Sequence, residues 1–319
     1  MQDKIIHIFK SHKDIYISGE DLSKKLGVSR TAIWKHMESL RKDGYVIDAH
    51  PHLGYKLLEV PDKLLPEEIA WQLRTEVIGK KIYSYQSLDS TNDTAYKLAE
   101  GGCPEGAIIL AEEQKSGKGR MGRRWNSPGG FGIYLSCVLR PDIAPNEASK
   151  ITLLAAISVA RAIRNQTHLA CLIRWPNDIL VDSKKICGIL TEMKAEQDNV
   201  AFLILGIGVN VNTPMDLLPK GASSIKELLQ DKVSRIELAK KILEELDFNY
   251  QVFMKDGFEP FVGDWDAYSA INGKRVKLTC HDKAIEGIAQ GIDDNGALIV
   301  RLDNGFLERV LAGDVTLLR

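Results

Sequence analysis

The sequence of 319 residues lacks the features that mark membrane-spanning, secreted and fibrous proteins. Its longest apolar runs, residues 151–160 and 201–211, fall far short of the ~20 residues that a membrane span needs. The first residues contain neither a long apolar core nor a small-residue cleavage site, so we expect no secretion signal. Hydrophobic residues make up 44% and charged residues 27% of the chain, which indicates a folded protein and excludes a disordered one.

Cysteine is scarce and widely spaced. The five cysteines form no Cys-x-x-Cys motif and no cluster with histidine, which argues against a disulfide framework and against a zinc site. We therefore expect free, mostly buried thiols in a reducing cytoplasm, and no metal held by the protein itself.

The chain also lacks an excess of charge of one sign. Lys and Arg number 42 and Asp and Glu 43, so the net charge of −1 excludes a chain that is basic throughout but permits a local basic face. At ~100–200 residues per domain, the length predicts two or three domains. Shifts in charge and pattern near Pro61, Pro66 and Asn272 predict domains at 1–62, 63–270 and 271–319.

The first predicted domain has the pattern of a helix-turn-helix. Ser18 opens a helix with the Ser-x-x-Asp spacing of a capping box, Gly27 interrupts it, and Ser29 can cap a second helix. Two helices joined by a short turn with glycine are typical of this motif. Residues 43–47 and 54–57 then predict a β-hairpin, which would make the fold a winged helix.

The second helix of this domain has a basic face. Between Ser29 and Lys42 there are four Lys or Arg and one Glu, a local charge of about +3. Such a face attracts phosphates, while polar side chains near the helix start can reach base edges. The residues that we expect at DNA are Ser29, Arg30, Thr31, Trp34 and Lys35. A winged helix that serves protein contacts is the alternative. Because one such unit makes few contacts, DNA binding would need a dimer and a two-fold operator.

The central region mixes strands and helices, which suggests an α+β domain with a mixed sheet. The expected strands are 81–86, 107–114, 132–140, 171–175, 185–193 and 200–211. The expected helices are 66–77, 91–101, 146–166 and 233–254.

The most unusual segment of the central region is residues 114–125, here called the glycine loop. It holds five cationic residues and three glycines in twelve positions, directly after an apolar strand. Glycines allow close approach of the backbone to a ligand, and successive N–H groups can bind an anion together with Lys and Arg. It is not a P-loop, because no Gly-Lys-Ser/Thr opens a helix after it. A flexible basic surface loop is the alternative.

Three further motifs contain polar residues that could line a binding site. The triplet Ser90, Thr91 and Asn92 can form a site but is also a good helix N-cap. Residues 174–180 and then Lys185 suggest strand, turn and strand, with that lysine at the start of a buried strand. An ordinary hairpin with solvated lysines is the alternative. Residues 206–212 form an apolar strand that ends in two amides, and 212–224 are expected to be a mobile loop.

The C-terminal segment alternates between apolar and polar residues in five short runs. Asp-Asn-Gly at 294–296 and 303–305 are strong tight-turn signals. Together they predict an SH3-like β-barrel, for which a purely structural cap is the alternative role.

In order and spacing, these motifs together resemble those of biotin–protein ligases, of the bifunctional kind that also represses biotin operons. The resemblance covers essentially the whole chain. It rests on residues 29–36, 90–92, a GRGRRGR-like loop at 117–123, 174–178, Lys185 before Gly-Ile-Leu, 206–210 and the C-terminal barrel. It implies an α+β multidomain fold with an N-terminal winged helix-turn-helix, a class II synthetase-like central mixed β-sheet with helices, and a C-terminal SH3-like β-barrel.

The resemblance implies an ATP-dependent, AMP-forming reaction in two steps. The biotin carboxylate attacks the α-phosphorus of ATP to give biotinyl-5′-AMP and pyrophosphate, and a lysine of biotin carboxyl carrier protein then takes the biotinyl group. Carriers would come from acetyl-CoA carboxylase and other biotin-dependent carboxylases. Mg²⁺ would accompany ATP, biotin is a substrate, and no cofactor is permanently bound. With biotinyl-5′-AMP as corepressor, the protein would form a homodimer on operator DNA of biotin genes.

The resemblance also assigns residues to roles. Catalytic roles fall to Lys185, Arg120 and Arg123. Biotin binding falls to Ser90, Thr91, Asn92, Gln114, Lys118, Gly119, Arg120, Trp125 and Lys185, with Ile189 and Leu190 as further apolar walls. ATP or adenylate binding falls to Lys118, Arg120, Arg123, Asn177, Asp178, Lys185 and Asn210.

The chain departs from the family pattern at two positions of the glycine loop. Lys118 stands where the family usually has Arg, which keeps the charge but loses the bidentate fork. We expect backbone contacts to compensate, with weaker retention of the adenylate as the risk. Met121 also replaces a common Arg, at a position that we expect to be solvated.

Two other functions are weighed against this one. A lipoate or octanoate ligase is disfavoured by the cationic glycine loop and by the winged helix. A ligand-sensing regulator without catalysis is disfavoured by the presence of Lys185, Arg120 and Asn210. For the ligase, we expect biotin and adenylate to order the glycine loop and residues 212–224, and this ordering to favour dimerisation and DNA binding.

Overall fold

A computed structural model describes residues 1–196, 199–280, 283–311 and 313–318. The chain divides into two compact units, Met1–Trp71 and Gln72–Arg319, which are described separately below. The predicted domain boundaries at 62/63 and 270/271 stay predictions. Within the described residues, no helix is long and apolar enough to cross a membrane.

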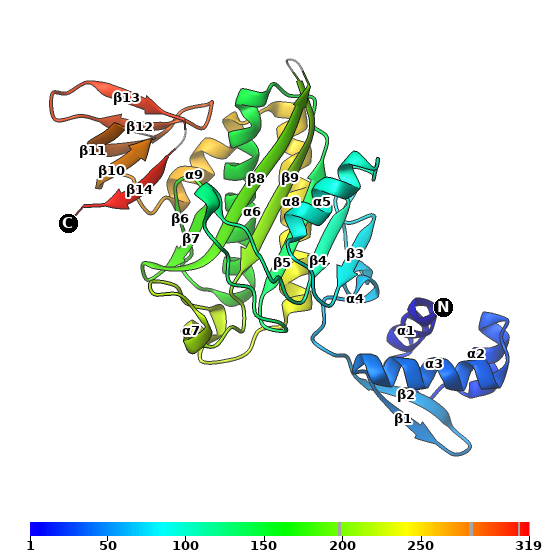
Figure 1. Ribbon diagram of the computed structural model, residues 1–319. Coiled ribbons are helices and arrows are strands. Elements are labelled where there is room, and N and C mark those ends of the chain that lie inside the picture. Colours follow the sequence, from blue (N-terminus) through cyan, green and yellow to red (C-terminus); the bar gives the residue numbers. More distant parts are fainter. Residues whose placement is uncertain (197–198, 281–282, 312, 319) are drawn as a thin grey trace. The chain divides into compact units, whose positions relative to one another are not determined.

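The first unit contains the predicted helix-turn-helix and its hairpin (Figure 1). Its elements are α1 (Gln2–Ser11), α2 (Gly19–Leu26), α3 (Arg30–Asp43), β1 (Val46–His50), β2 (Gly54–Glu59) and α4 (Pro66–Ala70). The Ser18 and Ser29 side chains accept backbone N–H groups of Asp21 and Ala32, which confirms both predicted helix starts. Strands β1 and β2 pair antiparallel and form the predicted wing.

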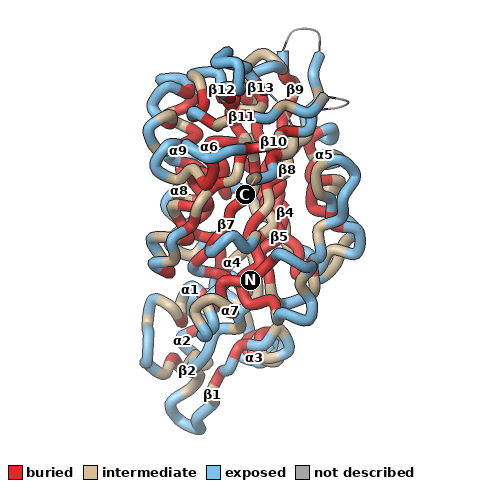
Figure 2. Tube along the Cα trace, turned by 90° about the vertical axis from the view of Figure 1, so that its left-hand side faces the viewer, coloured by how far each residue is buried: buried red, intermediate tan, exposed pale blue. Residues whose placement is uncertain are grey.

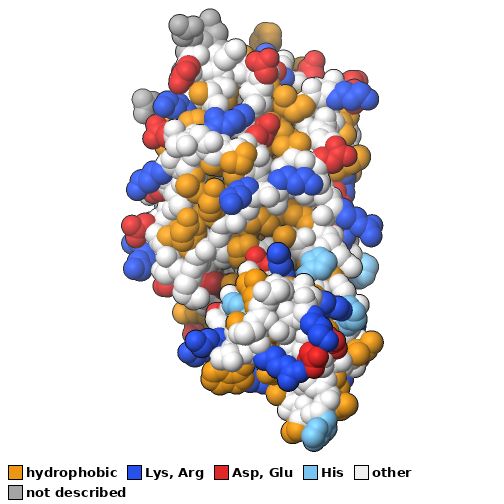
Figure 3. Space-filling view, turned by 90° about the vertical axis from the view of Figure 1, so that its right-hand side faces the viewer, with side chains coloured by type: hydrophobic (Ala, Val, Ile, Leu, Met, Phe, Trp, Pro, Cys, Tyr) orange, Lys and Arg blue, Asp and Glu red, His pale blue; other side chains and the backbone are white. Residues whose placement is uncertain are grey.

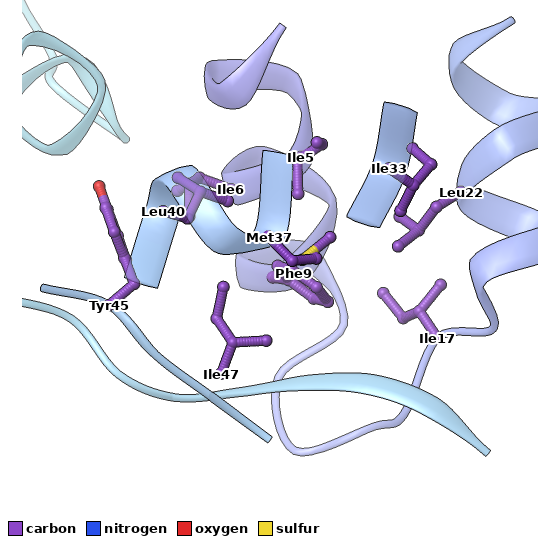
Figure 4. Close-up of a cluster of buried hydrophobic side chains, with 10 residues drawn as sticks. All are labelled: Ile5, Ile6, Phe9, Ile17, Leu22, Ile33, Met37, Leu40, Tyr45 and Ile47. Carbon is purple, nitrogen blue, oxygen red and sulfur yellow. The ribbon is translucent and has the colours of Figure 1, made fainter. Parts of the chain in front are cut away.

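Apolar side chains from all three long helices and the hairpin meet in one core (Figure 4). The fully buried or nearly buried members are Ile5, Ile6, Phe9, Ile17, Leu22, Ile33, Met37, Leu40, Tyr45 and Ile47. Burial of each large aliphatic or aromatic side chain is worth ~1.5–3 kcal/mol relative to exposure. This core fixes the angle between α2 and α3 and so leaves the opposite face of α3 in solvent.

The predicted helix over 66–77 is wrong in its length. Helix α4 ends at Ala70, because Trp71 leaves the helical backbone (ψ 114°) and Gln72 has a φ of 56°. The backbone N–H groups of Glu76, Val77 and Ile78 donate to the buried carboxylate of Asp247, at 2.7–2.9 Å. That carboxylate takes the place of the helical carbonyl acceptors, a contact over 169 or more positions that a local pattern does not show.

The second unit is built on a seven-stranded sheet in the order β3-β4-β5-β9-β8-β7-β6. Its strands are β3 (Ile82–Tyr85), β4 (Ile108–Ala111), β5 (Ile133–Leu139), β6 (Leu172–Arg174), β7 (Asp178–Val181), β8 (Lys184–Glu196) and β9 (Asn199–Val209). The pair β3 and β4 is parallel and the other neighbours are antiparallel, so the predicted mixed sheet is confirmed.

Helices cover both faces of this sheet. Helix α5 (Thr91–Glu100) packs on one face, and α6 (Ala148–Thr167) and α8 (Arg235–Asp256) pack on the other (Figures 1 and 2). Figure 2 shows buried residues along the strands and through α6. The short helix α9 (Val262–Tyr268) packs on α6, and α7 (Ile225–Leu229) follows β9. One-turn 3-10 helices lie at Arg120–Gly122, Pro145–Glu147, Met215–Leu217 and Glu259–Phe261.

Helices α7 and α9 and strand β7 were not predicted. Residues 172–196 form three strands, β6, β7 and β8, where two were expected. The turn between β7 and β8 uses Asp182 and Ser183, both at positive φ (48° and 64°). Two successive residues with positive φ are typical of a tight hairpin, but the usual Asn-Gly or Asp-Gly signal is missing here.

The C-terminal part of the second unit is a five-stranded antiparallel sheet in the order β13-β12-β11-β10-β14. Its strands are β10 (Arg275–Cys280), β11 (Lys283–Ile292), β12 (Leu298–Arg301), β13 (Leu307–Val310) and β14 (Asp314–Leu317). The five predicted strands are thus confirmed, while closure into an SH3-like barrel stays a prediction.

Figure 3 shows charges of both signs spread over one face of the chain, in keeping with its net charge of −1.

Candidate functional site

A cavity of about 360 Å³ in the second unit brings together motifs that are far apart in the sequence. It lies where the start of α5, the glycine loop, β7, β8, β9 and β14 meet. All the residues predicted for biotin, ATP and catalysis line it: Ser90, Thr91, Asn92, Gln114, Lys118, Gly119, Arg120, Arg123, Trp125, Asn177, Asp178, Lys185 and Asn210. The volume is of the size that holds a small organic ligand. Their individual roles stay predictions.

One end of the cavity, here called the amide end, is buried and lined by neutral polar side chains. The Thr91 backbone N–H donates to Gln114 Oε1 at 2.8 Å, and Gln114 Nε2 donates to Ser127 Oγ at 2.9 Å. Behind them, the buried Ser136 hydroxyl lies 2.8 Å from Thr91 Oγ1 and 2.6 Å from Asn92 Oδ1. The amide end thus presents fixed hydrogen-bonding groups, which suits a neutral polar ring.

The Ser90 triplet caps a helix and also lines the cavity, while its role in binding stays a prediction. The Ser90 side chain accepts the Asp93 N–H and caps α5, which is the N-cap function. Thr91 and Asn92, at 4% exposure each, turn into the cavity from the first turn of the same helix. The cap therefore fixes the backbone from which the two polar side chains extend.

Three glycines in β8 and β9 form the floor of the cavity. A Cβ at Gly206 would lie 2.2 Å from Asn92 Oδ1, and one at Gly208 would lie 2.5 Å from Trp125 Nε1. Gly188 pairs with Gly208 across the two strands. Glycine in a strand often marks a close approach of this kind, so here the side chains of Asn92 and Trp125 need the missing Cβ atoms.

The other end of the cavity, here called the charged end, is cationic with acidic partners. Lys185 Nζ lies 2.5 Å from Asp178 Oδ1, and the other oxygen of that carboxylate accepts from Arg174 at 2.7 Å. Arg120 donates to Asn177 Oδ1 at 2.9 Å and lies 3.8 Å from the Asp314 carboxylate. Arg123 also pairs with Asp314 of β14. The cations at this end are thus aimed by carboxylates that an anionic substrate can replace.

Lys185 is held more firmly than a surface lysine. It lies at the start of β8, where its backbone N–H and C=O bond Gly221 and Ser223. Its ammonium lies 5.4 Å from the ring centroid of Trp125, a cation–π contact. Since residues 221–223 are anchored in this way, the segment predicted as a mobile loop has one fixed end. Its mobility stays a prediction.

Lys118, at the position where the family usually has Arg, pairs with two acids. Its ammonium bonds Asp93 and lies 3.7 Å from Glu192 Oε1. The hydrogen bond to Asp93 holds the pKa of Lys118 above its usual value. Met121 is 70% exposed, as expected for a solvated position.

Of the acidic residues around the site, the sequence analysis predicted Asp178 and missed three others. Asp93, Glu192 and Asp314 pair with cations of the glycine loop that lie 25 or more positions away. Spacing offered one signal: Gly188, Leu190 and Glu192 alternate along one strand and so share a face. Ser136 lies directly behind the amide end. It could not be identified from the sequence, because the residues before and after it in the strand are apolar.

In the first unit, the residues predicted at DNA lie together on α3 and its cap. Ser29, Arg30, Thr31, Trp34 and Lys35 are all exposed, and Trp34 shows 53% of its surface. Arg30 pairs with Glu20 of α2. An exposed tryptophan on this face of α3 is consistent with a contact surface.

Three family models match consecutive parts of the chain. These are an HTH domain at residues 2–56, the Biotin/lipoate A/B protein ligase family at 84–210 and the Biotin protein ligase C terminal domain at 272–318. The solved biotin protein ligase from Aquifex aeolicus, in complex with biotin and ATP, is 29% identical with a TM-score of 0.64. That alignment covers 75% of this chain and 99% of that one.

Curated relatives are similar over nearly the whole length. The bifunctional ligase/repressor BirA of Bacillus subtilis is 38% identical over 321 residues, covering 99% of this chain and 98% of that protein. The protein of the same name from Escherichia coli is 32% identical, covering 94% of this chain and 92% of that protein. The chain therefore belongs to the biotin protein ligase family, in the group of bifunctional ligase/repressor proteins.

Proposed function

We propose that this chain activates biotin with ATP and transfers it to a lysine of biotin carboxyl carrier protein. The observation that carries this proposal is a single cavity with a neutral amide end and a cationic end. Biotin has the same polarity, with a neutral ureido ring at one end and a carboxylate at the other. Placed along the cavity, its ring would contact Ser90, Thr91, Asn92 and Gln114.

In the first step the carboxylate attacks the α-phosphorus of ATP and pyrophosphate leaves. A carboxylate is ionised at neutral pH, so this step needs no general base. It does need two anions held together while negative charge builds on the phosphoryl oxygens. Arg120, Arg123 and Lys185 are cations suited to stabilise that charge.

In the second step a neutral lysine amine of the carrier attacks the carbonyl of biotinyl-5′-AMP. An amide bond forms, AMP leaves, and the amine loses a proton. Alignment of the two reactants can supply up to ~7–11 kcal/mol in favourable cases. The glycine loop and Lys185 would provide that alignment and keep water from the mixed anhydride.

Mg²⁺ fits this site as a companion of ATP. It usually binds phosphate oxygens and waters with one or two carboxylates of the protein. The described residues contain no group of three His, Cys, Asp or Glu that could hold it alone, but Asp178 and Asp314 line the cavity. When bound, it would offset phosphate charge.

We further propose that the first unit binds operator DNA of biotin genes as a homodimer formed when biotinyl-5′-AMP is bound. The exposed basic face of α3 supports DNA contact, and two copies would supply two half-sites. A cytoplasmic location is favoured by buried free thiols at Cys103, Cys137, Cys171 and Cys187.

One paired experiment tests both activities. Transfer of biotin to a carrier domain is measured with ATP, and a gel shift with operator DNA is run with and without biotin plus ATP. We expect incorporation of one biotin per carrier and a stronger shift with both ligands. A thermal-shift comparison of biotin with lipoate distinguishes the ligase substrates, since stabilisation by lipoate alone would contradict the proposal.

A further inference from the structure

Glu192 of β8 contacts both the amide end of the cavity and the glycine loop. Its Oε2 accepts a hydrogen bond from Asn92 Nδ2 at 2.7 Å, at the amide end. Its Oε1 lies 3.7 Å from Lys118 Nζ, in the glycine loop. The strand pairs Glu192 with Ile204 of β9, so the carboxylate extends from a rigid part of the sheet.

The contact with Asn92 decides which way that amide points. Asn92 is 4% exposed, and its Oδ1 lies 2.6 Å from the Ser136 hydroxyl. A carboxylate accepts but never donates, so Glu192 requires the NH₂ group of Asn92 on its own side. Glu192 and Ser136 therefore fix the two ends of one buried amide.

The contact with Lys118 is of a different kind. Lys118 and Glu192 are 40% and 36% exposed, and Asp93 shares the same ammonium. Exposed ion pairs contribute little, whereas a hydrogen bond between a buried amide and a carboxylate is stronger. The hydrogen bond from Asn92 to one oxygen of Glu192 therefore contributes more free energy than the ion pair of the other oxygen with Lys118.

We propose that Glu192 is a positioning residue that couples the biotin ring site to the glycine loop. One carboxylate oxygen orients Asn92, and the other holds Lys118, so that ring binding and loop closure reinforce each other. This coupling rests on the proposed function, in which the amide end receives the ring of biotin. Glu192 bonds Asn92 and lies beside Lys118, while Asp93, the next residue after Asn92 in α5, gives Lys118 a second contact with the same helix turn.

The test uses two variants of the full chain, Glu192→Ala and Glu192→Gln. Glutamine can still accept from Asn92 but carries no charge for Lys118. We expect Glu192→Ala to raise the Kd of biotin about 10- to 150-fold, the value of a lost hydrogen bond to a charged group. Glu192→Gln should raise it only about two- to fivefold, the range of an exposed ion pair.

Trypsin reports on the loop separately, because residues 114–125 contain five of its cleavage sites. In the wild type, biotin should slow cleavage within the loop. At saturating biotin, Glu192→Gln should lose most of that protection, and Asp93→Asn, which releases the other partner of Lys118, should act in the same direction. As a control, Glu100→Gln removes an exposed ion pair with Lys194, which lies on β8 like Glu192. This variant should change neither the Kd of biotin nor the tryptic cleavage of the loop.

The outcomes are distinguishable. Wild-type affinity for biotin in Glu192→Ala would overturn the role at Asn92, and full protection in Glu192→Gln would overturn the role at the loop. A wild type that binds no biotin would overturn the proposed function and this coupling together, whereas unchanged variants of a biotin-binding wild type would overturn the coupling alone.

Discussion

The amide end and the charged end of the cavity are built by opposite means. At the amide end, Thr91 and Asn92 are buried and their partners are neutral hydroxyls and amides or the single carboxylate of Glu192. At the charged end, the ammonium and guanidinium groups are partly exposed and paired with Asp178 and Asp314. Under the proposed function, the ring would be recognised by groups that are fixed in advance, whereas the anions would be received by cations whose acidic partners they can replace.

Loss of a cation at the charged end should have the largest effect on rate. Lys185→Ala removes the ammonium that, under the proposed function, would face the reacting phosphate, so we expect pyrophosphate release to fall about 10²- to 10³-fold. Biotin affinity should change much less, because the amide end is intact. Lys184→Ala, which removes the neighbouring exposed lysine, is the matched control and should be near wild type. Comparable rates for the two variants would contradict the site assignment.

A methyl group added to a glycine of the cavity floor should weaken ligand binding at the amide end. In Gly206→Ala the new Cβ would lie 2.2 Å from Asn92 Oδ1, so Asn92 must move. Such overpacking costs about 1–3 kcal/mol, and we expect biotin affinity to fall about 5- to 150-fold by calorimetry. Gly263→Ala in α9 has no atom within 4 Å of its Cβ and serves as the control. Equal affinities in both variants would show that Asn92 does not contact the ligand.

Ser136→Ala tests whether the groups at the amide end are fixed from behind. The substitution leaves the oxygen of buried Asn92 without its hydroxyl partner, a loss of about 1–3 kcal/mol. We expect weaker biotin binding with nearly unchanged turnover at saturating biotin. Measurement of KM and kcat for biotin distinguishes weaker binding from slower turnover. A drop in kcat with an unchanged KM would contradict the view that the amide end is fixed from behind by Ser136.

The smallest effect should come from Lys118. Its pKa is raised in the folded protein, so the stabilisation is present below pH 10.5 and disappears as the pH rises above the folded pKa. Because the side chain is 40% exposed, we expect Lys118→Met to lower stability by less than about 1 kcal/mol at neutral pH. Thermal unfolding of both proteins between pH 7 and 11 should show the difference begin to shrink above pH 10.5, and a difference that grows there would contradict the prediction.

Local signals made much of this fold predictable. The caps Ser18, Ser29 and Ser90 and the turn glycines act within a few residues, so the helix starts and hairpins follow from the sequence. The cationic glycine loop could be identified because its residues are consecutive. Helix α4 was predicted too long because Asp247 binds the segment after it from 169 or more positions away. The partners Asp93, Glu192 and Asp314 escaped prediction for the same reason.

The bare floor of the cavity limits how the enzyme could be redesigned. Where Gly188, Gly206 and Gly208 lie, there is no side chain to trim, so substitution on that wall can only narrow the space. A bulkier acid would have to gain its room from the opposite side, where Trp125 of the glycine loop covers the strands. Libraries for an altered substrate range should therefore vary Trp125 and its neighbours and leave the three glycines untouched.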